Sequence, residues 1–178
     1  MKWWMVVAIV AAVARTSHAA EAGQPDPIDL RMKSEALVPV HVLKESQEEV
    51  ARIFAVAGLT VRWTDMEPRV TVTLVPQVLG YATAVSPVMG VARRTPNGST
   101  VQVFFRQVQD FARIYHVGLS TMLAYVISHE VGHLLLPTNA HSPTGLMQPA
   151  WDKALVRDAA RGSLTFTEAQ AATIRASR

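Results

Sequence analysis

The sequence predicts an α+β fold in which helices pack on a mixed β-sheet and a small helical part follows at the C-terminus. Three observations favour it. Short β-rich segments and a helical segment alternate in the first half of the chain. A strong turn signal, Pro96-Asn97-Gly98, separates two more β-rich segments. An apolar run from Leu119 to Leu136 is too long for a strand and has the length of a buried helix.

Residues 1–19 have the pattern of a secretory signal peptide. Lys2 supplies a positive start, an apolar run extends from Trp3 to Ala14, and Ser17-His18-Ala19 is a small-residue cleavage site. The run is shorter than the ~20 apolar residues that a membrane-spanning helix needs, and a retained anchor is the alternative. We therefore expect a secreted or periplasmic protein without a stable membrane anchor after cleavage.

Residues 20–34 are polar and contain two prolines, which predicts a flexible leader before a single domain over residues 35–178. Cleavage removes Lys2 and Arg15 from the 17 basic residues and leaves 15 against 14 acidic residues, a formal net charge of +1. This balance predicts no nucleic-acid partner, and we expect a monomer. The chain has no cysteine, which excludes disulfides, thiolate zinc ligands and a lipoprotein anchor.

Within the domain, alternating apolar residues predict a first strand over residues 37–43. A helix is expected from Glu45 to Ala57, with its early acids near the positive end of the helix dipole. Two further strands are predicted over residues 59–64 and 69–75. The first half therefore has the order β-α-β-β.

The second half begins with a predicted hairpin, in which residues 88–94 pair with residues 100–105. Arg93 and Arg94 in its first strand are expected to lie in solvent, although they could also favour acidic substrates. Thr165 or Thr167 is expected to cap the last helix. Helices are predicted over residues 107–115, 119–136, 152–160 and 167–176.

The apolar helix carries the sequence His129-Glu130-Val131-Gly132-His133. Histidines four residues apart on a helix lie one turn apart on the same face, so both imidazoles can reach one metal ion. Glu130 lies about 100° around the helix, where it is poorly placed as a ligand and well placed to hydrogen-bond a water. The pattern predicts a zinc-dependent hydrolase with Glu130 as general base, and an ordinary core helix with two histidines is the alternative.

Residues 128–149 resemble the corresponding segment of the metzincin clan of zinc metallopeptidases. That clan has the motif His-Glu-x-x-His-x-x-Gly-x-x-His, followed by a tight turn that carries a methionine. His129, Glu130 and His133 match the first part of the motif, and Gly145-Leu146-Met147 resembles the methionine turn. The resemblance implies a zincin-like fold, with Met147 as an apolar floor beneath the metal.

The segment departs from the metzincin pattern at the third ligand. Leu136 occupies the glycine position and Asn139 the third-histidine position, while His141 comes two residues later. Leu136 precedes Pro137, so the helix can end there without glycine. We therefore predict His141 as the third zinc ligand. The alternatives are Glu168, because some zinc peptidases take a later glutamate, and, less favoured, Asp152 and Asp158.

The resemblance implies a zinc endopeptidase that acts on protein or peptide substrates. Zinc held by His129, His133 and His141 would keep one position open for water, and Glu130 would pass the water's proton to the leaving nitrogen. Residues 88–93 would form the strand along which an extended peptide binds, although an ordinary hairpin strand is as consistent with the sequence.

One feature keeps a second function open. Some metzincins have a tyrosine just after the methionine turn, where this chain has Gln148-Pro149, so a phenol would have to come from elsewhere. The tyrosines that could supply it are Tyr81, Tyr115 and Tyr125. The alternative is an exported, metal-stabilised domain that binds a partner without catalysis. Glu130 favours the enzyme, because a structural zinc site has no use for a base.

Overall fold

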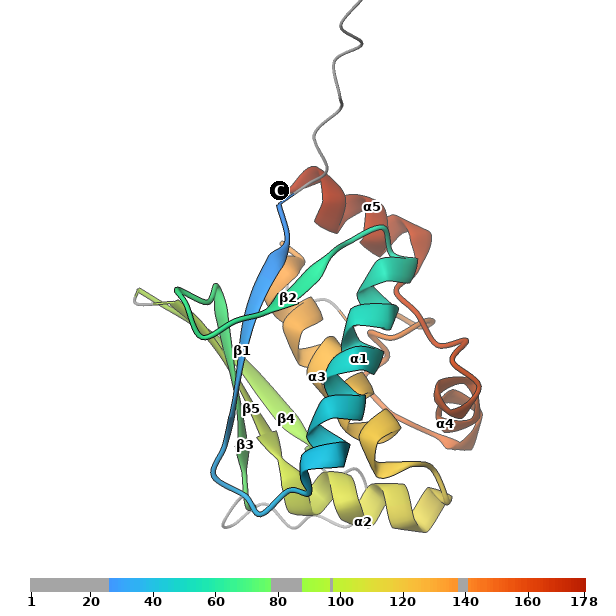
Figure 1. The fold of residues 1–178 in the computed structure, drawn as a ribbon. Helices are drawn as coiled ribbons and strands as arrows, with labels where there is room; N and C mark the ends of the chain where they lie inside the picture. The colour runs from blue at the N-terminus through green and yellow to red at the C-terminus, as the bar shows by residue number, and fades with distance from the viewer. Residues whose placement is uncertain (1–25, 78–87, 97, 138–140) are drawn as a thin grey trace, which may run out of the picture.

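The computed structural model describes residues 26–77, 88–96, 98–137 and 141–178, and the predicted signal peptide lies outside these ranges. Over the described residues the chain forms five strands and five helices (Figure 1). The strands make one mixed sheet, so the predicted α+β fold with a helix-packed mixed sheet is confirmed.

The sheet has the strand order β2-β1-β3-β5-β4. Its strands are β1 (Ile28–Ser34), β2 (Val61–Trp63), β3 (Val70–Val75), β4 (Gly90–Thr95) and β5 (Gly98–Phe104). Strands β2, β1, β3 and β5 pair in parallel, whereas β4 pairs antiparallel with β5. Strand β4 is therefore an edge strand.

The helices lie on one face of this sheet and at its ends. They are α1 (Val40–Val56), α2 (Phe105–Tyr115), α3 (Leu119–Leu135), α4 (Lys153–Ala160) and α5 (Glu168–Ala176). Helices α1 and α3 pack against each other beside the sheet, and α3 contacts β4 and β5 (Figure 1). Helix α4 lies on the far side of this pair from the sheet (Figure 1). Helix α3 is thus a central element of the fold.

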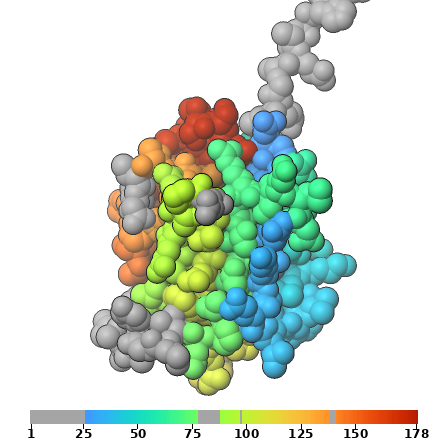
Figure 2. Space-filling model, turned by 90° about the vertical axis from the view of Figure 1, so that its left-hand side faces the viewer, coloured from blue at the N-terminus to red at the C-terminus, as the bar shows by residue number. Residues whose placement is uncertain are grey.

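Alternate residues of each strand face the helices or the opposite side of the sheet. The helix-facing residues include Ile28, Leu30, Val72, Leu74, Val101 and Val103, which are fully buried. The opposite face carries polar residues such as Thr71, Thr73, Arg93, Thr100 and Gln102. Figure 2 shows this face, with the strands side by side. The apolar core therefore lies between the sheet and helices α1 and α3.

The predicted flexible leader is wrong over residues 28–34, because these residues form β1 between β2 and β3. Ile28 and Leu30 are completely buried, and Met32 is partly buried on the same side. The period-two alternation of these three residues is itself a strand signal. The neighbouring prolines and charges obscured it, although they are compatible with a strand whose outer face is polar.

The predicted strand over residues 37–43 is also wrong, because α1 begins at Val40. Pro39 precedes the helix with φ −59°, the value that the proline ring imposes and that a helix start accepts. The first turn of α1 contains no acidic residue, so the acids expected at the helix start come later. The β-α-β-β order is nevertheless retained, because β1 replaces the misplaced strand.

The remaining elements confirm their predictions to within a few residues. Strands β2 and β3, the hairpin of β4 and β5, and helices α2 to α5 form where the patterns placed them. Leu136 is extended before Pro137, as expected. Thr167 caps α5 in a capping box with Gln170. Over the described residues, no helix is long and apolar enough to cross a membrane.

Candidate metal centre

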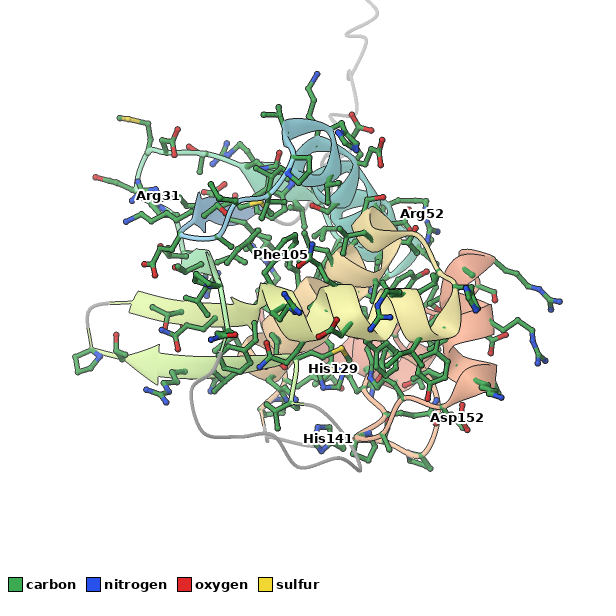
Figure 3. The ribbon with its side chains drawn as sticks, turned by 90° about the horizontal axis from the view of Figure 1, so that it is seen from below. Arg31, Arg52, Phe105, His129, His141 and Asp152 are labelled. Carbon is green, nitrogen blue, oxygen red and sulfur yellow. The ribbon has the colours of Figure 1, made fainter. Side chains whose placement is uncertain are left out.

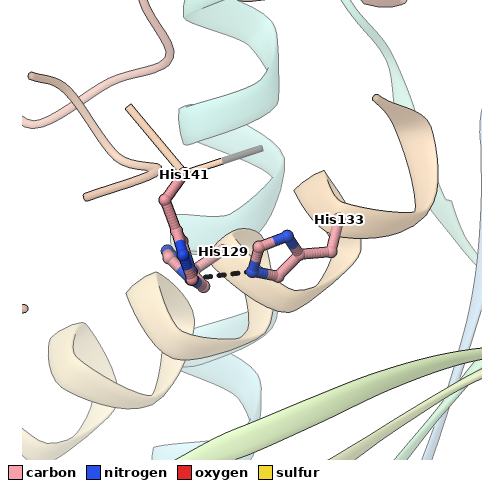
Figure 4. A group of neighbouring side chains, drawn as sticks. All are labelled: His129, His133 and His141. Carbon is pink, nitrogen blue, oxygen red and sulfur yellow. Dashed lines mark hydrogen bonds between the residues drawn. The ribbon is translucent and has the colours of Figure 1, made fainter. Parts of the chain in front are cut away.

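Three histidines meet beside the central helix (Figure 4). His129 and His133 extend from α3, and His141 comes from the segment that follows it. One nitrogen of each lies within 4.8 Å of the others, and the Nε2 atoms of His129 and His133 are 3.1 Å apart. His129 is buried, His133 is half-buried and His141 is exposed. The three side chains are therefore close enough to hold a metal ion that remains reachable from solvent.

A main-chain carbonyl fixes the orientation of His129. Its Nδ1 atom lies 2.9 Å from the carbonyl oxygen of Leu146. Because a carbonyl only accepts, Nδ1 carries the proton of this bond and Nε2 keeps its lone pair for the cluster. Metal-binding histidines commonly have such a partner on the second ring nitrogen. The main chain at Leu146 therefore holds His129 in an orientation that suits a metal ligand.

The surroundings also keep two of the histidines neutral. Burial lowers the pKa of His129 against the opposing effect of its bond to Leu146, and the charge of His141 lowers it further. Burial, followed by the charges of His129 and His141, lowers the pKa of His133 to about 4. Neutral imidazole is the form that binds a metal. At neutral pH each of the two side chains therefore keeps one unprotonated ring nitrogen.

Glu130 lies beside the cluster, between α3 and the edge strand β4. Its residue is only 8% exposed, and burial raises the pKa of its carboxyl group to about 7. A β-carbon on Gly90 of β4 would stand 2.7 Å from Cγ of Glu130 and 3.0 Å from Oε1. A carboxyl group with this pKa can both accept and return a proton near neutral pH.

The turn Gly145-Leu146-Met147, which was predicted to resemble a methionine turn, packs directly against helix α3. Gly145 has φ +75°, and the amide of Leu146 donates to the carbonyl of Thr165 at 2.8 Å. Met147 is completely buried. A β-carbon on Gly132, between the two helical histidines in sequence, would lie 2.6 Å from the sulfur of Met147. Met147 thus packs against the main chain of α3 between His129 and His133.

The cluster lies in a cleft of about 340 Å³. One side of the cleft is β4, and the segment with Pro149 and Trp151 contributes to its lining. The ring centroids of Trp151 and His129 are 6.0 Å apart. Apart from the histidines and Glu130, the described lining consists of Val88, Met89, Gly90, Val91, Ala92, Phe111, Val126, Pro149 and Trp151. Outside the cluster, the side chains that line the cleft are therefore mostly apolar.

The alternative ligands lie away from the cluster. Glu168 is mostly exposed and accepts a hydrogen bond from Arg175 at 2.7 Å. Asp152 caps α4 by accepting from the amides of Ala154 and Leu155. Figure 3 shows Asp152 on the same side of the molecule as His129 and His141, and its side chain caps α4 instead of joining the histidines. Among the described residues, the structure brings His141 to the helical pair, and it does not bring Glu168, Asp152 or Asp158 there.

The tyrosines considered as phenol donors are placed for other contacts. The hydroxyl of Tyr125 accepts from Arg52 of α1 at 3.1 Å, and burial raises its pKa to about 12. The ring of Tyr115 packs on Phe111 at 4.4 Å. Neither residue belongs to the described lining of the cleft, and Tyr81 lies outside the described residues. No phenol is therefore assigned to the site.

Two residues near the site were not predicted to contribute to it. Arg94, expected in solvent, donates to the carbonyls of Leu134 and Leu136 at the C-terminal end of α3. A local sequence pattern cannot predict a contact between residues that are 40 positions apart. Gly90 allows β4 to approach Glu130 closely. An isolated glycine in a strand often marks such an approach, so the position of Gly90 in the predicted strand could have indicated this contact.

Comparison with known proteins adds no family assignment. No protein-family model matches this chain, and no curated protein is significantly similar to it. The chemistry of the site therefore has to be argued from its own geometry.

Proposed function

We propose that this protein is an exported zinc-dependent peptidase of metzincin-like type. His129, His133 and His141 hold the zinc ion, and Glu130 is the general base. The observation that carries the proposal is the meeting of three histidine nitrogens within 4.8 Å beside a buried glutamate in one cleft. The likeness of residues 128–149 to the metzincin motif and turn supports it.

The donor set fits zinc. Imidazole nitrogens are common zinc ligands, and catalytic zinc sites use three protein ligands and leave a fourth position open. The Nδ1–Leu146 bond of His129 supplies the orienting partner that such ligands require. When bound, zinc would polarise the substrate carbonyl and lower the pKa of water.

Glu130 is placed to move the proton of this reaction. Its carboxyl group lines the same cleft as the three histidines, and its pKa is raised to about 7 by burial. It can take a proton from the attacking water and deliver that proton to the leaving nitrogen. Both transfers require a carboxyl group that lies beside the water and the leaving nitrogen, and Glu130 shares the cleft with the three histidines.

The edge strand is suited to bind an extended peptide. The amide of Phe104 donates to the carbonyl of Met89, and bonded pairs alternate along an antiparallel ladder. The main-chain groups of Gly90 and Ala92 therefore point away from β5. Extended peptides add to such an edge through main-chain hydrogen bonds. Since residues 88–92 line the cleft, a peptide bound there would pass the histidine cluster.

A second candidate is a metal-stabilised binding domain without catalysis. Its support is that no phenol from Tyr115 or Tyr125 reaches the described cleft. Against it stands Glu130, because a structural zinc site normally closes all four positions with protein ligands and needs no base. The peptidase is therefore the better-supported candidate.

The test combines metal analysis with cleavage assays on residues 20–178, purified without chelators. We expect about one zinc per chain by elemental analysis and cleavage of unfolded proteins or extended peptides by mass spectrometry. Glu130→Ala should retain zinc and lose cleavage, whereas Glu168→Ala should retain both. Zinc without cleavage in the wild-type protein would favour the binding domain. No zinc, even after its addition, would reject both candidates.

A further inference from the structure

Strand β4 and helix α3 approach each other most closely where Gly90 faces Glu130. A β-carbon on residue 90 would stand 2.7 Å from Cγ, 3.0 Å from Oε1 and 3.1 Å from Cδ of Glu130. The first of these distances is shorter than packed carbon atoms tolerate, since their best separation is about 3.5–4.0 Å. Any other residue at position 90 would therefore have to displace the glutamate or the strand.

Space, rather than backbone conformation, requires glycine at this position. Among the glycines that the structure describes, Gly58, Gly98, Gly145 and Gly162 have a positive φ, and Gly90 does not. Its backbone belongs to a regular antiparallel pair in which Gly90 lies opposite Val103. The strand conformation would accept alanine, and the three atoms nearest to the added β-carbon all belong to the side chain of Glu130.

Neither partner can move away easily. Strand β4 is paired with β5 along its whole length. Arg94 ties it to α3 a second time, through the carbonyls of Leu134 and Leu136. Glu130 is 8% exposed and lines the cleft, so its side chain can be displaced only toward the cleft and not deeper into the packed core. The distance between strand and helix is therefore set at two places along the same edge.

We propose that Gly90 is a positioning residue for Glu130. Its missing side chain lets the glutamate lie against the main chain of β4, which limits the directions in which the carboxyl group can point. The outer main-chain edge of β4 also faces the cleft at Gly90. The contact at Gly90 therefore sets the distance between this edge and the carboxyl group of Glu130. The catalytic consequence rests on the proposed peptidase function, whereas the contact itself does not.

The contact is tested by a double-mutant cycle on the unfolding of residues 20–178 in urea. Gly90→Ala should lower the urea midpoint in the wild-type background. In the Glu130→Ala background the colliding atoms are gone, and the same substitution should leave the midpoint nearly unchanged. Glu168→Ala is the matched control, because it removes an exposed glutamate on α5 and should not relieve the effect. Equal midpoint shifts in all three backgrounds would overturn the proposal.

A folding failure is also informative in this cycle. If Gly90→Ala does not fold and the double variant with Glu130→Ala does, the rescue supports the contact. If neither folds, the loss does not depend on Glu130 and the proposal is wrong.

Kinetics test the positioning role. Gly90→Ala should reduce kcat by at least about 10-fold, with KM and zinc content unchanged, because it displaces the base and leaves the histidines in place. A raised KM with unchanged kcat, or a loss of zinc, would contradict positioning. If the wild-type protein cleaves no peptide, the proposed function fails, and the unfolding cycle still decides whether Gly90 fixes Glu130.

Discussion

The sulfur of Met147 lies against the main chain of Gly132, where a β-carbon would stand 2.6 Å from it. The ring of Phe166 approaches the same point, at 2.9 Å. The preceding residue, Leu146, accepts the hydrogen bond from His129 through its carbonyl. The adjacent residues Leu146 and Met147 thus contact helix α3 at His129 and at Gly132. The turn and the histidine pair are one packed unit.

Gly132→Ala should therefore destabilise the protein, although alanine is intrinsically the better helix residue. The helix-propensity gain of about 1 kcal/mol opposes an overpacking cost of about 1–3 kcal/mol. We expect a net loss of up to about 2 kcal/mol in the free energy of unfolding, measured in urea. In the Met147→Ala background the loss should shrink, because the nearest atom is removed. A stabilised Gly132→Ala variant would show that the turn does not pack as described.

His141→Ala should weaken zinc binding strongly. Losing the orienting partner of a ligand typically costs about 10–100-fold in affinity, so loss of a ligand should cost at least about 100-fold. Competition with a chromophoric chelator measures the dissociation constant. Glu168→Ala is the control and should leave affinity unchanged, because its carboxylate pairs with Arg175. The reverse order of effects would make Glu168 the third ligand.

Arg94→Ala should destabilise the junction of β4 with the C-terminal end of α3. The guanidinium donates to two carbonyls that the helix itself leaves unpaired, and we expect a loss of about 1–2 kcal/mol in unfolding free energy. Arg93→Ala is a matched control, because Arg93 faces the other side of the sheet and should change stability by less than about 0.5 kcal/mol. Similar losses for both variants would argue against the Arg94 contact.

The metal-free protein should show a pH dependence of stability that changes in Glu130→Gln. Burial raises the pKa of Glu130 from 4.5 to about 7, so its contribution is fully present below pH 4.5 and is lost as pH rises through 7. Glutamine has no such charge to bury. The unfolding free energy of the variant relative to wild type should therefore increase by roughly 3 kcal/mol between pH 4.5 and 8.

In the same experiment, the titration of the histidines changes the unfolding free energy in the opposite direction to that of Glu130. The pKa of His133 falls from 6.5 to about 4, so the stability it contributes is complete above pH 6.5 and is lost as pH falls toward 4. In wild type the two effects oppose each other between pH 4.5 and 6.5, whereas in Glu130→Gln only the histidine effect remains. Urea unfolding in the presence of a chelator measures both curves. Parallel curves would show that Glu130 is not buried as a carboxyl group.

The helical motif could be predicted because its geometry is local. Helical periodicity alone places His129 above His133 and turns Glu130 to one side, and the structure has this helix where the apolar run placed it. The end of α3 at Pro137 is equally local. The misplaced first strand shows the limit of such reasoning. Residues 28–34 and 37–43 both alternate, and only pairing with β2 and β3 selects the former.

The sequence by itself determined the helix that carries His129 and His133, the hairpin, the later helices and the set of candidate ligands, because each depends on spacing between neighbours in the chain. Only the tertiary structure decided that His141 and not Glu168 meets the helical pair, that Gly90 faces Glu130, and that Arg94 joins β4 to α3. The physical reason is that contacts between distant segments depend on which apolar surfaces can be buried together. That choice is made by the packing of the whole core, and no single stretch of sequence contains it.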